Sequence, residues 1–426
     1  MMNNKILALC ALTAIGGNIH ISAQRDHRLD RDVVSVVNDE KTDASKVEQS
    51  FKDNAPKTPN DNGLPRFALV GKDGQFYIGI GAQFLGEGVF DWGDEMPSVL
   101  NFTPSSITPR VAGNGASTRF AWQSSSIYFN FLSMPESANR LGIFFKAKFT
   151  GGSNSFHVSH VYGKYRGLTV GYTNSSFTDG AAQPMTIDSE GPNGYPSLSL
   201  FTLYWQQQFG HGFSGALGID APSASLTVDA TTENVSQRVP AIPLYLQYAW
   251  DNRGSHVRLS GLYRPLQYRD LKAEVNHTVS GAGIQLSGMA HIAGPLSMQY
   301  NAVYGSGIST YLQDDNGIGL DAVAVHNELG KMKAVRAMGL TAGLNYVFSP
   351  KVSANASYSH LTNWLPDDAA VEANTYRYGD YAAVNVLYAF NKFIAAGIEY
   401  DYGHRMSLSG TGLHTNRLQA QMSVTF

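Results

Sequence analysis

The feature that most constrains this chain is a two-residue alternation of apolar and polar side chains over most of its length. In a β-strand, successive side chains point to opposite faces, so the alternation gives each segment one apolar and one polar face. This pattern is typical of strands that lie between lipid and water. It is strongest at the C-terminus, where polar residues separate Leu418, Ala420, Met422, Val424 and Phe426.

The alternating segments are joined in an unequal way. Short connectors, such as 210–212 and 391–392, alternate with long loops, such as 175–196 and 307–333. We count about sixteen strands, an even number that returns both ends of the sheet to one side. The predicted strands are 75–88, 118–131, 140–149, 155–165, 168–174, 197–209, 213–221, 240–250, 255–266, 276–291, 296–306, 334–347, 352–361, 379–390, 393–402 and 414–426.

Composition favours a membrane barrel over a soluble β-sandwich. Charged residues make up only 15% of the chain, whereas a soluble domain usually has about a quarter. An apolar band crossed by tilted strands needs about nine to eleven residues per strand, which these segments supply. In lipid, every backbone group finds a partner only if the sheet closes. We therefore predict an all-β fold, a transmembrane antiparallel β-barrel of about sixteen strands.

The first 74 residues differ from the rest. Residues 1–23 have a short basic start and an apolar run that contains the single cysteine, Cys10, and are predicted to be a signal peptide. Residues 24–74 are charged and rich in Pro and Asn, which predicts a periplasmic segment that is flexible or partly helical. The barrel is expected to occupy 75–426, in the outer membrane of a Gram-negative cell.

The sequence contains no catalytic, phosphate-binding or dinucleotide-binding motif, so we expect no catalytic residue and no cofactor. The net charge of −3 gives no basic excess for nucleic acid. His157 and His160 have a spacing that suggests metal ligands, but within a strand a three-residue offset places them on opposite faces. No metal site is therefore expected.

Charged side chains on the polar face are expected to line a water-filled lumen. The acidic, Gly- and Pro-rich loop 175–196 follows the fifth predicted strand, and we expect residues 176–195 to fold into the barrel and narrow it. Its acids would then face a basic wall and set up a transverse field. The candidate constriction residues are Arg119, Lys146, Lys148, His157, Asp179, Asp188, Glu190, Arg258 and Arg417.

Several segments resemble the DcaP-like outer-membrane porins of Gram-negative bacteria. Residues 156–179 with 187–194 resemble a strand, a turn, a strand and a constriction loop of that family, and 117–120 with 124–125 and 127–130 are similar to its second strand. The terminal Phe426 is similar to the assembly signal of outer-membrane barrels. The resemblance implies a homotrimer of sixteen-stranded pores that pass small anionic nutrients such as dicarboxylates.

The sequence thus predicts a porin that allows passive diffusion of small hydrophilic solutes and contacts the lipid bilayer and lipopolysaccharide of the outer membrane. Two alternatives stay open: an outer-membrane hydrolase, and a structural or adhesive barrel with an occluded lumen. A hydrolase needs a nucleophile and a base within hydrogen-bonding range. His256 and Ser260 share a face, but they lie about 13 Å apart along one strand.

Overall fold

The computed structural model describes residues 34–36, 44–57, 64–65, 67–71, 74–251 and 254–426. The predicted signal peptide, 1–23, lies outside the described residues. No helix in the described part of the chain is long and apolar enough to cross a membrane.

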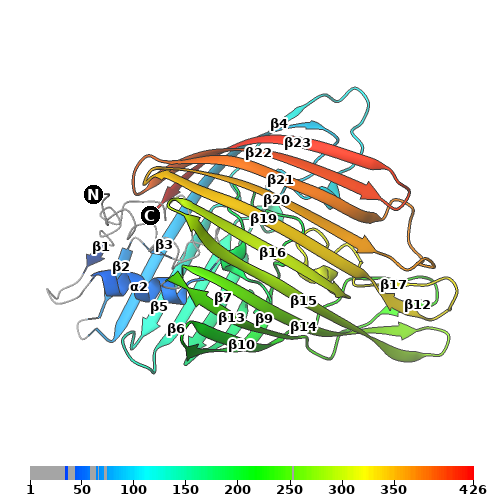
Figure 1. Ribbon diagram of the computed structural model, residues 1–426, viewed down its shortest axis with the longest axis horizontal. Helices are drawn as coiled ribbons and strands as arrows, with labels where there is room; N and C mark the ends of the chain where they lie inside the picture. Colours follow the sequence, from blue (N-terminus) through cyan, green and yellow to red (C-terminus); the bar gives the residue numbers. More distant parts are fainter. Residues whose placement is uncertain (1–33, 37–43, 58–63, 66, 72–73, 252–253) are drawn as a thin grey trace.

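The body of the molecule is a closed antiparallel β-barrel of sixteen strands, as predicted (Figure 1). Each strand pairs with the next along the chain, and the last pairs with the first in the register Thr425↔Gln83 to Thr415↔Gly93. The barrel strands are β3 (Phe76–Gly93), β4 with β5 (Ser117–Ala121, Ser126–Ser133), β6 (Leu141–Lys148), β7 (His157–Tyr165), β8 (Leu168–Asn174), β9 (Ser199–Gly210), β10 (Phe213–Asp220), β13 (Ile242–Trp250), β14 (Ser255–Asp270), β15 (Val275–Ala293), β16 (Leu296–Ser306), β19 (Arg336–Ser349), β20 (Val352–Trp364), β21 (Tyr376–Ala389), β22 (Ile394–Ser407) and β23 (Gly412–Thr425).

Two details of the strand prediction need correction. The second strand, expected to be continuous, is interrupted between β4 and β5, where Ser125 donates its backbone N–H to Trp122 O. Several strands also extend further toward the long loops than expected. The pair β14 and β15, for example, continues to Asp270↔Val275. Long loops cover these extensions, so apolar and polar residues alternate less regularly in the extensions than in the apolar band.

The two faces of the sheet differ as the alternation requires. On β21, Val384 and Val386 point outward and are 55% and 52% exposed, whereas Ala383 and Asn385 point inward and are buried. The aromatic residues at strand ends, including Phe209, are exposed on the outer surface. Lipid can therefore cover the outside, and polar side chains line the inside.

The chain before β3 contributes to the same sheet. Strand β2 (Phe67–Val70) pairs with β3 in the register Phe67↔Ile80 to Val70↔Tyr77, and β1 (Val34–Val36) pairs in parallel with β2. The backbone groups of Phe426 and Ala82 form two hydrogen bonds with each other, and this is the last contact between the C-terminus and β3. Beyond it, β2 pairs with the same edge of β3. The helix α2 (Ala44–Asn54) lies at this short-turn end of the barrel (Figure 1).

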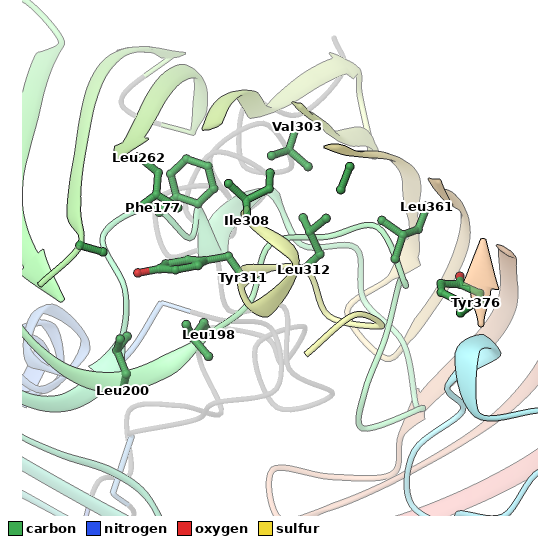
Figure 2. Close-up of a cluster of buried hydrophobic side chains, with 12 residues drawn as sticks. Phe177, Leu198, Leu200, Leu262, Val303, Ile308, Tyr311, Leu312, Leu361 and Tyr376 are labelled. Atoms are coloured by element: carbon green, nitrogen blue, oxygen red, sulfur yellow. The ribbon is translucent and has the colours of Figure 1, made fainter. Parts of the chain in front are cut away.

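Four long loops pack against one another inside the other half of the barrel. They are 94–116, 175–198, 221–241 and 307–335. They carry a small sheet of β11 (Leu226–Thr227), β17 (Ala322–Ala324) and β18 (Met332–Ala334), whereas β12 (Thr232–Asn234) of the third loop pairs with β14 and extends the wall. An apolar cluster joins two of these loops to the wall; Figure 2 shows Phe177, Ile308, Tyr311 and Leu312 together with strand residues such as Leu262. The interior therefore has its own hydrophobic core.

Candidate functional site

The loop 175–198, called here the lumen loop, crosses the inside of the barrel as predicted. It connects β8 to β9, and none of its residues is exposed. Its tip reaches the opposite wall, where Glu399 of β22 accepts hydrogen bonds from Ile187 N at 2.8 Å and Asp188 N at 2.6 Å. Gly194 N donates to Ser359 Oγ of β20 at 2.9 Å. The lumen loop is therefore fastened on both sides of the lumen.

Glycine makes one of these contacts possible. A Cβ on Gly194 would lie 2.6 Å from His360 O, and a Cβ on Gly339 of β19 would lie 2.0 Å from Gly194 O. The backbones of the loop and the wall therefore approach more closely than any side chain would allow.

Asp179 anchors the beginning of the lumen loop. Its Oδ2 lies 2.9 Å from His256 Nε2 and accepts a hydrogen bond from Ser287 Oγ at 2.7 Å. Burial would raise the pKa of Asp179, but the charges of Arg258 and His256 outweigh it and hold that pKa well below its usual range. Asp179 thus faces β14 and β15, and not the wall that carries Lys146 and Lys148.

Arg258 of β14 joins this anchor. Its guanidinium lies 3.6 Å from Asp179 Oδ1, donates to Gln247 Oε1 and to Thr178 O, and stands 4.0 Å from the centre of the Tyr245 ring. Arg258 is half-buried between the lumen loop and the wall. It therefore positions the loop as well as adding positive charge to the lumen.

Asp188 braces the tip of the lumen loop. Its carboxylate accepts hydrogen bonds from Phe102 N of the loop 94–116 and from Gly191 N, both at 2.8 Å. Burial, with the nearby charge of Glu399, raises the pKa of Asp188. Asp188 therefore connects the lumen loop with the loop 94–116.

Glu190 brings the acidic tip close to the basic wall. Burial raises the pKa of Glu190 to about 8, the charges of Asp188 and Asp314 add to this, and the positive charge of Lys148 opposes it. The neighbouring Ser189 Oγ lies 3.1 Å from Ser124 Oγ, between β4 and β5. Of the three predicted acids, Glu190 is the one that the structure places beside a predicted lysine.

Lys146 and Lys148 lie on the inward face of β6, as expected, and Lys146 is buried. The adjacent strand β7 contains a β-bulge, so that His157 pairs with Lys148 and His160 pairs with Lys146. The prediction that the two histidines lie on opposite faces is therefore wrong, because the extra residue of the bulge resets the alternation. His160 Nδ1 lies 3.0 Å from Thr173 Oγ1.

Arg119 and Arg417 meet at a residue that the sequence reading missed. Both guanidinium groups hold the buried carboxylate of Asp91 on β3, with Arg417 Nε 2.7 Å from Asp91 Oδ1. Both also donate to carbonyl oxygens of the loop 94–116, including Ser98 O. This pair fixes that loop and lies in a different part of the lumen from Lys146. The predicted first strand ended at residue 88, and continuing its alternation would have found Asp91.

The predicted residues thus form three groups. Glu190 lies with the wall of Lys146, Lys148 and His157; Asp179 lies with Arg258; Arg119 lies with Arg417. The ninth, Asp188, lies apart from these groups, between Glu399 and the loop 94–116. No group of three or more His, Cys, Asp or Glu side chains in the described residues has the arrangement of a metal site. Ser287 bonds to Asp179 and not to His256, an arrangement that differs from a hydrolase triad.

No protein-family model matches the chain, and no curated protein matches its sequence. Solved structures match over most of its length. The outer membrane channel DcaP of Acinetobacter baumannii has a TM-score of 0.71 at 16% identity, covering 84% of this chain and 99% of that one. OmpT, an outer membrane protein of Vibrio cholerae, has a TM-score of 0.52 at 10% identity, covering 83% and 98%. An anion-selective porin from Comamonas acidovorans has a TM-score of 0.52 at 8% identity, covering 82% and 100%.

These identities are low, so the likeness concerns the fold. The chain has the fold of an outer-membrane porin, and at this level the comparison confirms the resemblance to the DcaP-like porins.

Proposed function

We propose that this protein is an outer-membrane porin through which small hydrophilic solutes diffuse passively, with a modest preference for anions such as dicarboxylates. The observation that carries the proposal is the lumen loop, which is fastened across a closed barrel and places its tip beside a basic wall. A loop of this kind narrows a pore without closing a catalytic site around a substrate. We assign no catalytic step to it.

The anion preference rests on Lys146 and Lys148. Both point inward on β6, beside His157 and His160, so this strip of the wall is basic. Glu190 opposes them, and its raised pKa of about 8 keeps it largely neutral at neutral pH. The narrow section therefore has a positive excess, which favours anions.

The test is electrical. The purified protein in a planar bilayer should give single-channel steps, and its reversal potential in a salt gradient should indicate a preference for anions. Replacing Lys146→Gln and Lys148→Gln together should move the reversal potential toward cation selectivity, because two positive charges leave the wall. A matched control, Lys272→Gln with Lys392→Gln, removes equal charge from two other turns of the barrel and should leave the reversal potential unchanged. If Lys146→Gln with Lys148→Gln also leaves the reversal potential unchanged, these two lysines do not determine the ion selectivity.

A homotrimer is part of the proposal, and a polar cluster on the outer face supports it. Asp380 of β21 has the outward parity of Val384, and its carboxylate lies 2.8 Å from His360 Nδ1 and 3.1 Å from His404 Nδ1. Ionisable groups are costly against lipid, so another protein surface is a better neighbour for this face. Light scattering of the detergent-solubilised protein should give three times the mass of one chain; the mass of one chain would contradict the trimer.

A further inference from the structure

The helix α2 binds to the inner face of the barrel wall. Its buried residues are Val47, Ser50, Phe51 and Asn54, which form one continuous stripe at helical spacing, and Ala55, just after the helix, is buried as well. Its other side, with Lys46 and Gln49, is exposed. An amphipathic helix of this kind lies with one side against a surface, and this surface is the inside of the pore.

The wall residues that receive α2 all face the lumen. Val47 and Phe51 pack with Tyr77 of β3 and Leu132 of β5. Ala55, just after the helix, packs with the row formed by Tyr128, Phe144 and Tyr162, whose rings are stacked on β5, β6 and β7. The docking surface thus spans four neighbouring strands.

Polar groups of the wall complete the C-terminal end of α2. The last carbonyl groups of a helix have no partner within it. Here Asn130 Nδ2 donates to Phe51 O at 3.0 Å, Tyr162 OH donates to Asn54 O at 2.6 Å, and Lys164 Nζ donates to the same oxygen at 3.1 Å. The wall therefore recognises a helix end, and not only an apolar surface.

Two glycines of the wall leave room for this segment. A Cβ on Gly142 of β6 would lie 2.1 Å from Asn54 Oδ1, and a Cβ on Gly79 of β3 would lie 2.3 Å from Pro65 Cγ and 3.1 Å from Phe51 Cε1. Both glycines are at positions that face the inside of the barrel, where any side chain would displace residues 44–55 or Pro65. The wall is therefore shaped to accept it.

The helix lies next to the basic strip along the pore. The inward residues of β6 are, in order, Gly142, Phe144, Lys146 and Lys148, and the segment 44–55 covers the first two. Two residues along a strand span about 7 Å. The docked segment therefore begins within about this distance of Lys146 along the wall.

We propose that α2 is a gate: docked, it narrows the pore at its short-turn end, and when it leaves this surface the pore conducts more. This inference rests on the proposed porin function. The helix has 11 residues, and one this short is marginal on its own in water, so its order depends on docking. Its outer links are two ion pairs, the exposed pair of Lys46 with Glu136 and the partly exposed pair of Arg140 with Asp53, and surface pairs of this kind contribute little.

Single-channel recording of the full chain tests the gate. Deletion of residues 44–57 should raise the conductance by about two-fold or more, since a helix with its side chains is about 10–12 Å across. Gly142→Ala should give part of this rise, because its methyl group clashes with docked Asn54. The matched control is Gly163→Ala on β7, where a Cβ has no neighbour closer than 3.8 Å; it should conduct like the parent.

A disulfide provides a comparison within one molecule. Asn54 Cγ lies 2.7 Å from the position of a Gly142 Cβ, so Asn54→Cys with Gly142→Cys should form a bond that locks α2 in place. With Cys10→Ser to remove the other thiol, the oxidised channel should conduct like the parent, and a reductant should raise its conductance. Equal conductance before and after reduction would overturn the gate, as would a folded deletion variant that conducts like the parent. If neither the parent nor any variant conducts, the porin function itself fails.

Discussion

The lumen loop and α2 both occupy the inside of the barrel, but they are held in different ways. The lumen loop is tied to several parts of the wall, among them Asp179 to β14 and β15, Gly194 N to Ser359 on β20, Asp188 N to Glu399 on β22, and Ser189 to the turn between β4 and β5. Among the described residues, the helix α2 packs on one side of the lumen, against the inner face of β3 to β7 and the adjoining residues Leu64, Ala68 and Val70. A segment fixed on opposite walls cannot leave without breaking several buried contacts, whereas one held on a single wall can leave as a unit. The difference separates a permanent constriction from a movable one.

The largest expected effect is that of removing the permanent constriction. Tyr195 OH donates to Asp179 O, so the two ends of the loop meet at its base, and residues 180–194 can be replaced by a short Gly-Ser linker. Because the tip no longer crosses the lumen, single-channel conductance should rise about two- to three-fold. Far-ultraviolet circular dichroism should confirm that the barrel still folds. Unchanged conductance in a folded barrel would mean that the loop does not set the narrowest section.

Combining this replacement with the deletion of α2 tests whether the two segments restrict the pore independently. If the two segments narrow the pore in series, the segment that remains limits the conductance of each single variant. The double variant should therefore conduct more than either single variant. A double variant that conducts like the loop variant would assign the whole resistance to the lumen loop.

An intermediate effect is expected at Glu399, which accepts the backbone N–H groups of Ile187 and Asp188. Glu399→Ala leaves these buried donors without their acceptor, at a cost of about 1–3 kcal/mol. Hydrogen exchange of the Asp188 amide should accelerate by about ten- to a hundred-fold. Glu399→Gln keeps one acceptor oxygen and should give a smaller change. If the amides of α2 exchange faster as well, the two segments are coupled, and the lumen loop and α2 are not held independently.

The sequence predicted the barrel well because alternation depends on local geometry. Each strand must place apolar residues on the lipid side, so Val384 and Val386 could be assigned outward without any knowledge of their neighbours. The same reasoning correctly assigned Lys146 and Arg417 to the inside. It failed between His157 and His160, because a β-bulge inserts one residue without a marked change in composition.

The partners across the lumen could not be predicted in this way. Alternation says which face a side chain occupies, but not where around the barrel it lies. The acids Asp179 and Asp188 were expected to face one basic wall, yet they lie against β14 and β22, because the path of the loop decides which wall each one meets. The docking of α2 depends on shape as well. Its buried stripe spans about two turns, and its site was marked only by two glycines, Gly79 and Gly142, in a chain that contains 43.

The smallest expected effect is a pH dependence that concerns the permanent constriction alone. The pKa of Glu190 is raised to about 8 because burial and the charges of Asp188 and Asp314 disfavour ionisation, and Lys148 only partly offsets them. As the pH rises through about 8, Glu190 gains a negative charge beside the basic wall. The preference for anions should therefore fall, by about two-fold or less in permeability ratio, because one charge among several changes.

Reversal potentials in one salt gradient at pH 6, 7, 8 and 9 measure this change. Glu190→Gln should largely remove it; the remaining change belongs to Asp188 and Asp314, whose pKa values burial also raises, that of Asp314 to about 7. Lys148→Gln should move the midpoint of this change in reversal potential to higher pH, because the variant loses the positive charge that favours the ionised form of Glu190. Deletion of α2 should leave the midpoint in place, since none of the charges that act on Glu190 lies on that helix. A midpoint that moves when α2 is deleted would show that the gate and the constriction share one electrostatic site.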